Sequence, residues 1–262
     1  MDLLVDGRRV FAATGGKPFD PARAPVLLLH GAGMDHTAWG LQTRWLAHHG
    51  RSVLAVDLPG HGRSAGPGLA SIPDMGRWVL ALLDAAGADR VAIGGHSMGA
   101  LVALAGVAAA PDRFRALALL GVTPDMPVHP DLVAAARAGG PLAPELMSSW
   151  GFGPRAQLGG HRAPGLWMVA GGIRLIGEAD PETLATDLEA CAAYGGALAA
   201  AAAVACPTLL LLGAEDRMTP AGRARPLGQA IAGARTVVLA GAGHMIMTER
   251  PDETLSALAE IF

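Results

Sequence analysis

Residues 94–100 read GGHSMGA, so Ser97 has a glycine two positions away on either side. The residues before it, 90–96, are strand-like, and the residues after it, 98–110, are apolar and helix-like. A strand that turns abruptly into a helix forces its corner residue into a strained conformation, and flanking glycines remove side chains that would clash there. The hydroxyl is then exposed beside a helix N-terminus, which adds a positive partial charge and the free N–H of Met98. This pattern predicts a nucleophilic serine, provided that the chain also supplies a base, an acid and a site for an oxyanion.

The elements that must position this serine alternate between short apolar runs and longer helix-like stretches. The alternation is typical of a mostly parallel sheet with helices on both faces. Residues 2–5 and 8–13 flank Asp6-Gly7, a dipeptide suited to a type I′ hairpin, so two antiparallel strands are expected to begin the sheet. The sequence therefore predicts an α/β fold with eight strands. The six further segments predicted as strands running into loops are 25–31, 52–60, 90–97, 116–122, 208–216 and 236–244, and the predicted helices are 37–48, 72–86, 98–110, 221–232 and 251–262.

The interval from 124 to 203 breaks this alternation. It lacks a plausible buried strand and is rich in proline, glycine, methionine and tryptophan. We predict that residues 124–203 form a helical cap inserted into a core that consists of residues 1–123 and 204–262. The alanine-rich end of the interval, at 197–207, is predicted as a helix that leads back to the core, because alanine favours helix.

Composition argues against several classes of partner. The formal charge is −3 over 262 residues, only 16% of the residues are charged, and like charges form no runs. Neither nucleic acid nor a membrane surface is therefore predicted as a partner, and a small neutral substrate fits better. The amino terminus has no basic segment followed by a long apolar run, and no stretch reaches about 18 uninterrupted strongly apolar residues. These observations predict a cytoplasmic protein, and they leave its oligomeric state open.

Metal and cofactor sites are not predicted. Cys191 and Cys206 lack the paired spacing of a zinc site, and the remaining histidines form no metal-ligand set. Residues 60–65 fit a loose dinucleotide-binding pattern, but Pro59 and the lack of a following helix start argue against nucleotide binding. We therefore expect no cofactor and no metal.

Five motifs make the chain resemble the α/β-hydrolase superfamily, in particular its capped serine esterases and related lipases. They cover nearly the whole predicted core, and the resemblance is weak across 124–203. It implies an α/β-hydrolase fold with an inserted helical cap. The motifs are His30-Gly31, DLPGHGRS at 57–64, GHSMG at 95–99, GAEDRMTP at 213–220 and GAGHMIMTERP at 241–251.

The catalytic residues of that family occur in the order nucleophile, acid, histidine, which this chain supplies as Ser97, Asp216 and His244. Asp216 and His244 each follow a predicted strand, so both are expected at the sheet edge where open α/β sheets bind ligands. By resemblance, His244 accepts the Ser97 proton and returns it to the leaving group, while Asp216 fixes the tautomer of the imidazole. Two other acids are alternatives: Glu215, which is expected to point elsewhere, and Asp125, which matches an alternative acid site of the superfamily.

Residues 30–33, His-Gly-Ala-Gly, match the oxyanion loop of the family. By resemblance, the backbone N–H of Ala32 joins that of Met98 in holding the negative oxygen of a tetrahedral intermediate. Loss of one such donor costs about 3 kcal/mol of transition-state stabilisation, so the loop is expected to matter as much as a side chain. Residues 57–64 are expected to shape the wall of the site rather than to react.

Four of the large apolar residues in the predicted cap are candidates for contact with substrate, and residues 146–173 include almost no acidic or basic side chains. Together with Met245, which follows the predicted catalytic histidine, these residues could line an apolar pocket above the serine, although packing within the cap explains each of them equally well. The four candidates in the cap are Trp150, Phe152, Trp167 and Met168.

We therefore predict a serine hydrolase that cleaves a carboxylic ester of a small, largely apolar substrate through an acyl-enzyme. A lactonase, thioesterase, C–C hydrolase or perhydrolase could use the same triad, and the sequence does not separate them. Ser97 argues against haloalkane dehalogenases and epoxide hydrolases, relatives that carry aspartate at this corner. A ligand receptor that keeps the fold without turnover is the alternative from another class of protein, and the intact triad argues against it.

Overall fold

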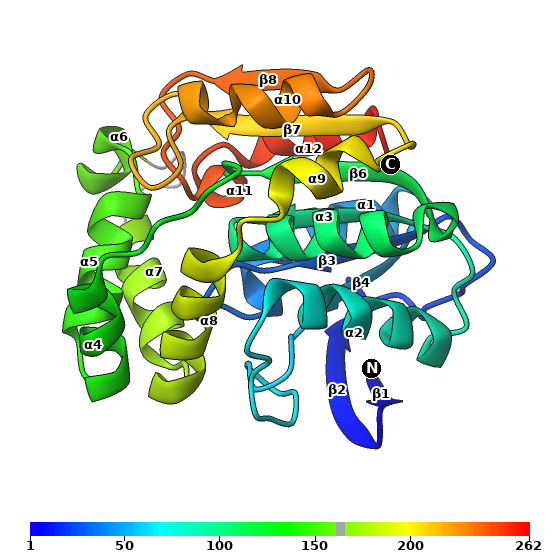
Figure 1. Cartoon of the computed structure of the whole chain (residues 1–262), viewed down its shortest axis with the longest axis horizontal. Coiled ribbons are helices and arrows are strands. Elements are labelled where there is room, and N and C mark those ends of the chain that lie inside the picture. The colour runs from blue at the N-terminus through cyan, green and yellow to red at the C-terminus, as the bar shows by residue number, and fades with distance from the viewer. Residues whose placement is uncertain (161–165) are drawn as a thin grey trace.

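The computed structural model describes residues 1–160 and 166–262 (Figure 1). The described residues form one sheet of eight strands in the order β1-β2-β4-β3-β5-β6-β7-β8. β2 pairs antiparallel with β1 and β4, and the other strands pair in parallel, so the predicted fold class is confirmed. The strands are β1 (Asp2–Val5), β2 (Arg8–Ala13), β3 (Pro25–Leu29), β4 (Ser52–Val56), β5 (Val91–His96), β6 (Phe114–Leu120), β7 (Thr208–Gly213) and β8 (Arg235–Leu239).

The first hairpin turns where the sequence predicts it. Val5 pairs with Arg8, and the two residues between them, Asp6 and Gly7, have φ values of 48° and 76°. Positive φ at both central positions is the mark of a type I′ turn, whose twist matches that of the two strands.

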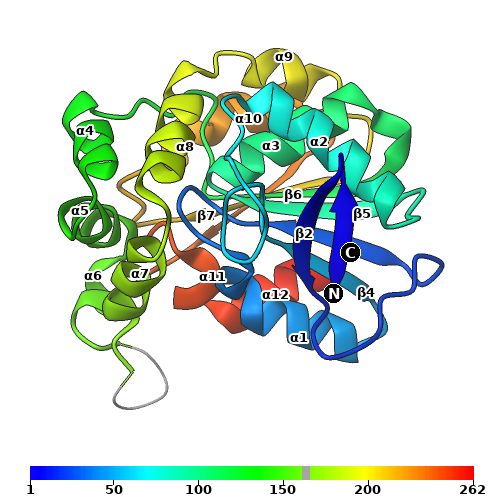
Figure 2. The same cartoon turned by 90° about the horizontal axis from the view of Figure 1, so that it is seen from below.

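Helices cover both faces of the sheet (Figure 2). Helices α1, α11 and α12 lie on one face, and α2, α3 and α10 lie on the other, and each predicted helical stretch contains helix. The bounds are α1 (Gly40–His48), α2 (Ile72–Ala85), α3 (Met98–Ala109), α10 (Arg225–Ala230), α11 (Ile246–Glu249) and α12 (Pro251–Ala259), with short 3-10 turns η1 (His36–Trp39), η2 (Pro111–Arg113) and η3 (Ala221–Ala224).

Strand β3 illustrates why these apolar runs become central strands. Leu27 and Leu29 belong to the core that includes α2 and α3, whereas Val26 and Leu28 belong to the core that includes α1 and α12. Successive side chains of a strand point to opposite faces, so a strand buried on both faces is a continuous apolar run.

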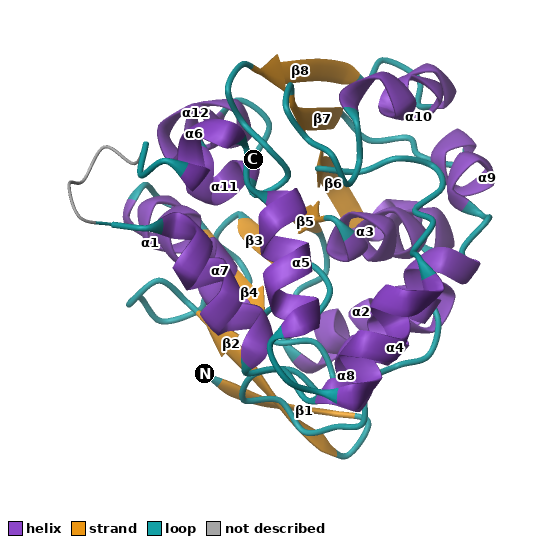
Figure 3. Ribbon diagram, turned by 90° about the vertical axis from the view of Figure 1, so that its left-hand side faces the viewer, coloured by secondary structure: helices purple, strands orange, loops and turns teal. Residues whose placement is uncertain are grey.

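Residues 124–203 connect β6 to β7 and contain helices but no strand among their described residues. Within this segment α4 packs against α5 and α8, and α5 packs against α7, whereas α9 packs on α3 and α10. Figure 3 looks onto the end of the sheet, with α5 and α7 in front of the strands. The helices are α4 (Pro130–Ala138), α5 (Leu142–Gly151), α6 (Pro154–Gln157), α7 (Met168–Gly177), α8 (Pro181–Ala193) and α9 (Ala197–Ala202).

Helix α3 is apolar nearly all round because it is buried between the sheet, α2 and α9. Gly76 of α2 faces Gly106 of α3 at short range: a Cβ at Gly76 would lie 2.9 Å from the backbone nitrogen of Gly106. This close packing fixes the helix that begins directly after Ser97.

No helix in the described part of the chain is long and apolar enough to cross a lipid bilayer.

Candidate active site

Ser97 occupies the corner between β5 and α3. Its backbone has φ 55° and ψ −120°, a conformation that residues with a Cβ rarely adopt. The flanking glycines are required by space, since a Cβ at Gly95 would overlap the carbonyl oxygen of Gly99, and a Cβ at Gly99 would overlap that of His30. The backbone therefore presents the Ser97 side chain at the C-terminal end of β5, beside the first turn of α3.

His244 and Asp216 form a buried pair. Nδ1 of His244 lies 2.8 Å from Oδ2 of Asp216. Because a carboxylate accepts the Nδ1 proton, Nε2 of His244 is left as the nitrogen that can accept one. The imidazole bonds to Asp216 and Thr219 rather than to Ser97 in this structure, and contacts between a catalytic base and its partner often tighten only when substrate binds.

Thr219 completes the surroundings of Asp216, a role that is not among the predictions from the sequence. Its Oγ1 donates to Asp216 Oδ2 at 2.7 Å, and its N–H donates to Oδ1 at 2.8 Å, where the N–H of Met218 also donates at 2.9 Å. Burial raises the pKa of Asp216, but the charge of His244 and the hydrogen bonds from His244 and Thr219 lower it by more, so this pKa lies well below its usual value. The signal in the sequence that could have indicated this contact is a short polar side chain in the turn directly after Asp216.

The two alternative acids lie elsewhere. Asp125 is exposed in the loop after β6, where its backbone carbonyl accepts a hydrogen bond from Thr123. Glu215 approaches the start of α6: a Cβ at Gly153 would lie 3.1 Å from its Oε2. Among these three acids, Asp216 is the one that is hydrogen-bonded to His244.

His96, which precedes the serine, is fully buried. Its Nε2 lies 3.0 Å from the carbonyl oxygen of His244, and the two rings are 4.7 Å apart. Burial and the neighbouring His244 lower the pKa of His96 to about 3. A neutral His96 therefore donates to the backbone of His244 and links the serine corner to the histidine loop.

Ala32 and Met98, the two predicted oxyanion donors, both lie near the serine. Ala32 borders the same cavity as Ser97. Met98 is the first residue of α3, where a backbone N–H has no helical carbonyl partner. A Cβ at Gly31 would lie 3.2 Å from Ser97 Cβ, so the loop that contains Ala32 passes directly beside the serine.

Ser97 and His244 border a cavity of about 260 Å³. Three of the predicted pocket residues, Trp150, Phe152 and Met245, border it as well. The 124–203 segment supplies most of the apolar wall, from Met126, Leu132, Met147, Trp150, Phe152, Ile176, Leu188 and Cys191, and His129, Ser148 and Arg217 add polar side chains to the lining.

Trp167 and Met168 are placed differently from the prediction. They border a neighbouring cavity of about 320 Å³, which Phe152 and Met245 share. The reason is the phase of α7, whose buried face consists of Val169, Gly172 and Ile176. Trp167 and Met168 fall outside that face, and Trp167 is 56% exposed.

Both cysteines are free thiols, and Cys191 of α8 is buried at the cavity wall. Burial and the charge of Asp187 raise the pKa of the Cys191 thiol far above its usual value. Cys191 therefore remains protonated at neutral pH. Cys206 is only half-buried.

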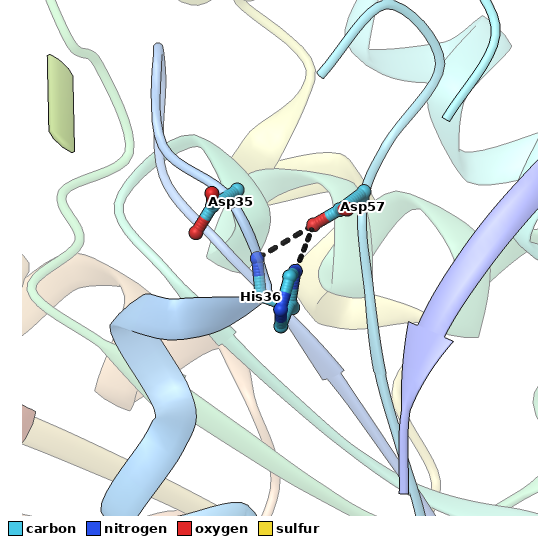
Figure 4. A group of neighbouring side chains, drawn as sticks. All are labelled: Asp35, His36 and Asp57. Atoms are coloured by element: carbon cyan, nitrogen blue, oxygen red, sulfur yellow. Dashed lines mark hydrogen bonds and ion pairs between the residues drawn. The ribbon is translucent and has the colours of Figure 1, made fainter. Parts of the chain in front are cut away.

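Asp35, His36 and Asp57 bring three atoms of the kind that bind metals within 4.8 Å of one another (Figure 4). These atoms are already in use. Asp57 Oδ1 accepts hydrogen bonds from the backbone N–H and Nδ1 of His36, both at 2.7 Å, and Oδ2 accepts one from the N–H of Arg63. Asp35 accepts from the N–H of Thr37. The group is a hydrogen-bonded brace for the 57–64 loop, and its chemistry does not call for an ion.

Comparison with known proteins agrees with this architecture. The profile of the "Alpha/beta hydrolase family" matches residues 26–257. Epoxide hydrolase A of Mycobacterium tuberculosis is 28% identical over an alignment that covers 99% of this chain and 96% of that protein. Four other curated relatives are matched over less than half of their own length; the alignments cover 26–45% of those proteins.

Two solved structures match nearly the whole chain. The enol-lactonase from Burkholderia xenovorans LB400 is 26% identical with a TM-score of 0.89, over 99% of this chain and 98% of that one. A thermophilic esterase from Thermogutta terrifontis is 25% identical with a TM-score of 0.85, over 99% of this chain and 96% of that one. The family profile covers most of the sequence, and the chain belongs to the alpha/beta hydrolase family.

Proposed function

We propose that this hydrolase is a serine esterase that cleaves a carboxylic ester of a small, largely apolar substrate through an acyl-enzyme on Ser97. The observation that carries the proposal is the arrangement around one cavity. A serine held at a strained corner and a histidine bonded to a buried carboxylate border the same apolar space. These are the parts that nucleophilic acyl transfer requires.

In the first half of the reaction, Nε2 of His244 accepts the proton of Ser97 Oγ as the oxygen attacks the carbonyl carbon. Asp216 keeps the Nδ1 proton in place and stabilises the imidazolium that forms. The imidazolium then gives its Nε2 proton to the alcohol oxygen as the ester C–O bond breaks. The alcohol leaves, and the acyl group remains on Ser97.

The backbone N–H groups of Ala32 and Met98 are the proposed donors to the negative oxygen of the tetrahedral intermediate. Fixed donors of this kind stabilise charge without reorganising during the reaction. In the second half of the reaction, His244 takes a proton from water as the water oxygen attacks the acyl carbon. The imidazolium then returns that proton to Ser97 Oγ as the bond between Oγ and the acyl carbon breaks, and the acid leaves. This route uses side chains and backbone amides alone.

We propose that residues 124–203 act as a cap over this site, with α5, α7 and α8 forming the roof of the cavity. Helix α9 packs on core helices, so it serves as the return to the core. The cavity of about 260 Å³ is close to the lower end of the roughly 300–1,000 Å³ typical of small-molecule pockets. This size and the apolar wall favour a short, neutral acyl group.

A lactonase is the second candidate, because the enol-lactonase from Burkholderia xenovorans LB400 matches this chain over nearly its full length. A lactone is an internal ester, and the same triad would open it. The difference is that the alcohol stays attached to the acyl group after the ring opens.

A fluorophosphonate label and a panel of substrates test the proposal. The wild-type protein is expected to be labelled once, at Ser97, and to hydrolyse p-nitrophenyl esters from acetate upward. Lactones and thioesters of matched acyl length belong in the same panel. A wild-type protein that binds these esters without turnover, or a label found on another residue, would overturn the proposal.

A further inference from the structure

A fully buried aspartate of the 124–203 segment reaches into the loop that carries Ala32. Asp187 of α8 accepts a hydrogen bond from the N–H of Gly33 at 2.9 Å, and the same oxygen lies 2.7 Å from Nε2 of His61. Gly33 also packs on α8 directly, since a Cβ there would lie 2.6 Å from Leu184 Cδ1. Residues more than a hundred positions apart in the sequence thus contact one another beside the serine.

Both ring nitrogens of His61 face oxygen acceptors. Nδ1 lies 3.1 Å from the carbonyl oxygen of Pro59, and Nε2 faces Asp187. Only the imidazolium donates at both positions. Burial lowers the pKa of His61, but the charge and the hydrogen bond of Asp187 raise it by more, and the net shift is upward. The pair is therefore a buried ion pair between a core loop and α8.

His30 holds the same loop from the other side. Its Nε2 accepts a hydrogen bond from the N–H of Leu58 at 3.1 Å, so Nδ1 carries the proton and donates to the carbonyl oxygen of Gly31 at 2.8 Å. Burial and the charge of His61 lower the pKa of His30 to about 4, which keeps this tautomer neutral.

These bonds bracket Ala32. The carbonyl of Gly31 and the N–H of Ala32 belong to one peptide group, and the carbonyl of Ala32 and the N–H of Gly33 belong to the next. His30 fixes the first group and Asp187 fixes the second. The carbonyl of Gly31 also accepts a hydrogen bond from the N–H of Met34 at 3.2 Å. The direction of the Ala32 N–H is therefore set by contacts within the core and by one contact from α8.

We propose that Asp187 is a positioning residue, which holds the Ala32 N–H toward the reacting carbonyl and makes that geometry depend on the seating of α8. The inference rests on the proposed function. Helix α8 also borders the substrate cavity through Leu188 and Cys191. A substrate that seats α8 correctly thereby also completes the oxyanion site.

The energetics of buried charges favour a positioning role for Asp187 over a role in stabilising the fold alone. A buried ion pair often stabilises a fold no better than well-packed apolar residues of the same volume. Oδ1 of Asp187 is moreover buried without a hydrogen-bond partner among the described residues. What an apolar side chain could not supply at this position is an acceptor for the Gly33 N–H.

The test compares Asp187→Ala, Asp187→Asn and a control on the same helix, Glu189→Gln, whose side chain is about half exposed and pairs with Arg137. Active sites are counted by the end point of fluorophosphonate labelling, so that kcat refers to folded enzyme. Asp187→Ala is expected to lower kcat about 10- to 100-fold with KM within about threefold, as for partial loss of one oxyanion donor. Asp187→Asn keeps an acceptor and is expected to recover most of that loss, and Glu189→Gln should match the wild type.

A second measurement separates positioning from stability. The affinity for a trifluoromethyl ketone, which forms a tetrahedral adduct with the serine, should fall in parallel with kcat/KM in Asp187→Ala. If Asp187→Ala does not fold, His61→Gln carries the test, with an intermediate loss in kcat and unchanged KM, and Asp187→Asn is again expected to stay close to the wild type. Wild-type kcat per labelled site in all folded variants would overturn the inference, whatever their melting temperatures. A wild type that is neither labelled nor active would instead overturn the proposed function.

Discussion

The cavity has two walls that are built in different ways. On the core side, Ser97, Asp216 and His244 follow strands of the sheet, and backbone constraints determine where they lie. On the other side, α5, α7 and α8 supply apolar side chains from helix faces. The core wall tolerates almost no change in backbone position, since an added methyl at Gly95 or Gly99 would overlap the main chain.

Under the proposed function, this difference assigns the chemistry to the core wall and the substrate selectivity to the helical wall. Proton transfer and oxyanion binding need distances fixed within a few tenths of an ångström, and strand ends supply them. Apolar recognition needs only volume and surface, so helix faces suffice. Substitutions on the core wall should therefore lower kcat by orders of magnitude, and substitutions on the helical wall should move substrate preference.

The largest expected effect is that of Ser97→Ala. Loss of the proposed nucleophile should lower kcat by about five to six orders of magnitude, as does removal of the catalytic serine from a serine protease, and abolish fluorophosphonate labelling. Ser148→Ala removes the other serine that borders the cavity, from the helical wall, and should change KM by no more than about tenfold. Comparable losses of kcat in Ser97→Ala and Ser148→Ala would contradict the assignment of different roles to the two walls.

Asp216→Asn should lower kcat by about three to four orders of magnitude, because the amide can hold the imidazole but favours the wrong tautomer. Asp125→Asn is the matched control, since Asp125 is an exposed acid at the neighbouring strand end. Steady-state kinetics on a short ester decide the question. Near-normal turnover in Asp216→Asn, together with a large loss of turnover in Asp125→Asn, would mean that Asp125 is the acid of the triad.

Trp150→Ala should shift the preferred acyl length toward longer chains while leaving kcat on an acetate ester within about threefold. Each buried methylene contributes about 0.8 kcal/mol, or about fourfold in kcat/KM, until the cavity is full. Trp167→Ala is the control, because Trp167 borders the neighbouring cavity. An unchanged profile in Trp150→Ala, or equal shifts in both variants, would contradict the assignment of the helical wall.

The smallest expected effect concerns the link between the walls. The pKa of His61 is raised in the folded protein above its unfolded value of 6.5, so the pair with Asp187 contributes its full stability below pH 6.5 and loses it as the pH rises through the raised pKa. The difference in free energy of unfolding between wild type and His61→Gln should therefore shrink between pH 6 and 9. His30, Asp57 and Asp187 are the other titratable groups that act in this cluster. A difference that is constant across that range in urea titrations would mean that His61 does not titrate between pH 6 and 9.

Much of the core could be predicted because its signals are local. The strand at 25–29 is a continuous apolar run since it is buried on both faces, and the corner at Ser97 is marked by glycines that the backbone cannot replace. The positions of Asp216 and His244 follow from the parallel sheet, whose strand ends share one edge. The acid–histidine contact was therefore within reach of the sequence.

The helical wall could not be predicted to the same depth. Whether Trp167 or Trp150 borders the cavity depends on the rotation of α7 and α5 about their axes, which tertiary packing sets. The bonds of Asp187 to Gly33 and His61 span 154 and 126 residues, and no pattern near Asp187 announces them. Thr219 lies between these cases, because its contact with Asp216 is only three residues away.

The thiol at the cavity wall has a consequence for turnover. A cysteine thiolate reacts readily with activated acyl groups, so a charged Cys191 would compete with water for the acyl group on Ser97 and leave a thioester that blocks the cavity. Burial and the negative charge of Asp187 hold Cys191 in its protonated form, in which it is a poor nucleophile. In the proposed mechanism, the aspartate that anchors α8 thereby also keeps the acyl group from being transferred to Cys191, and the same protonation makes the thiol slow to oxidise.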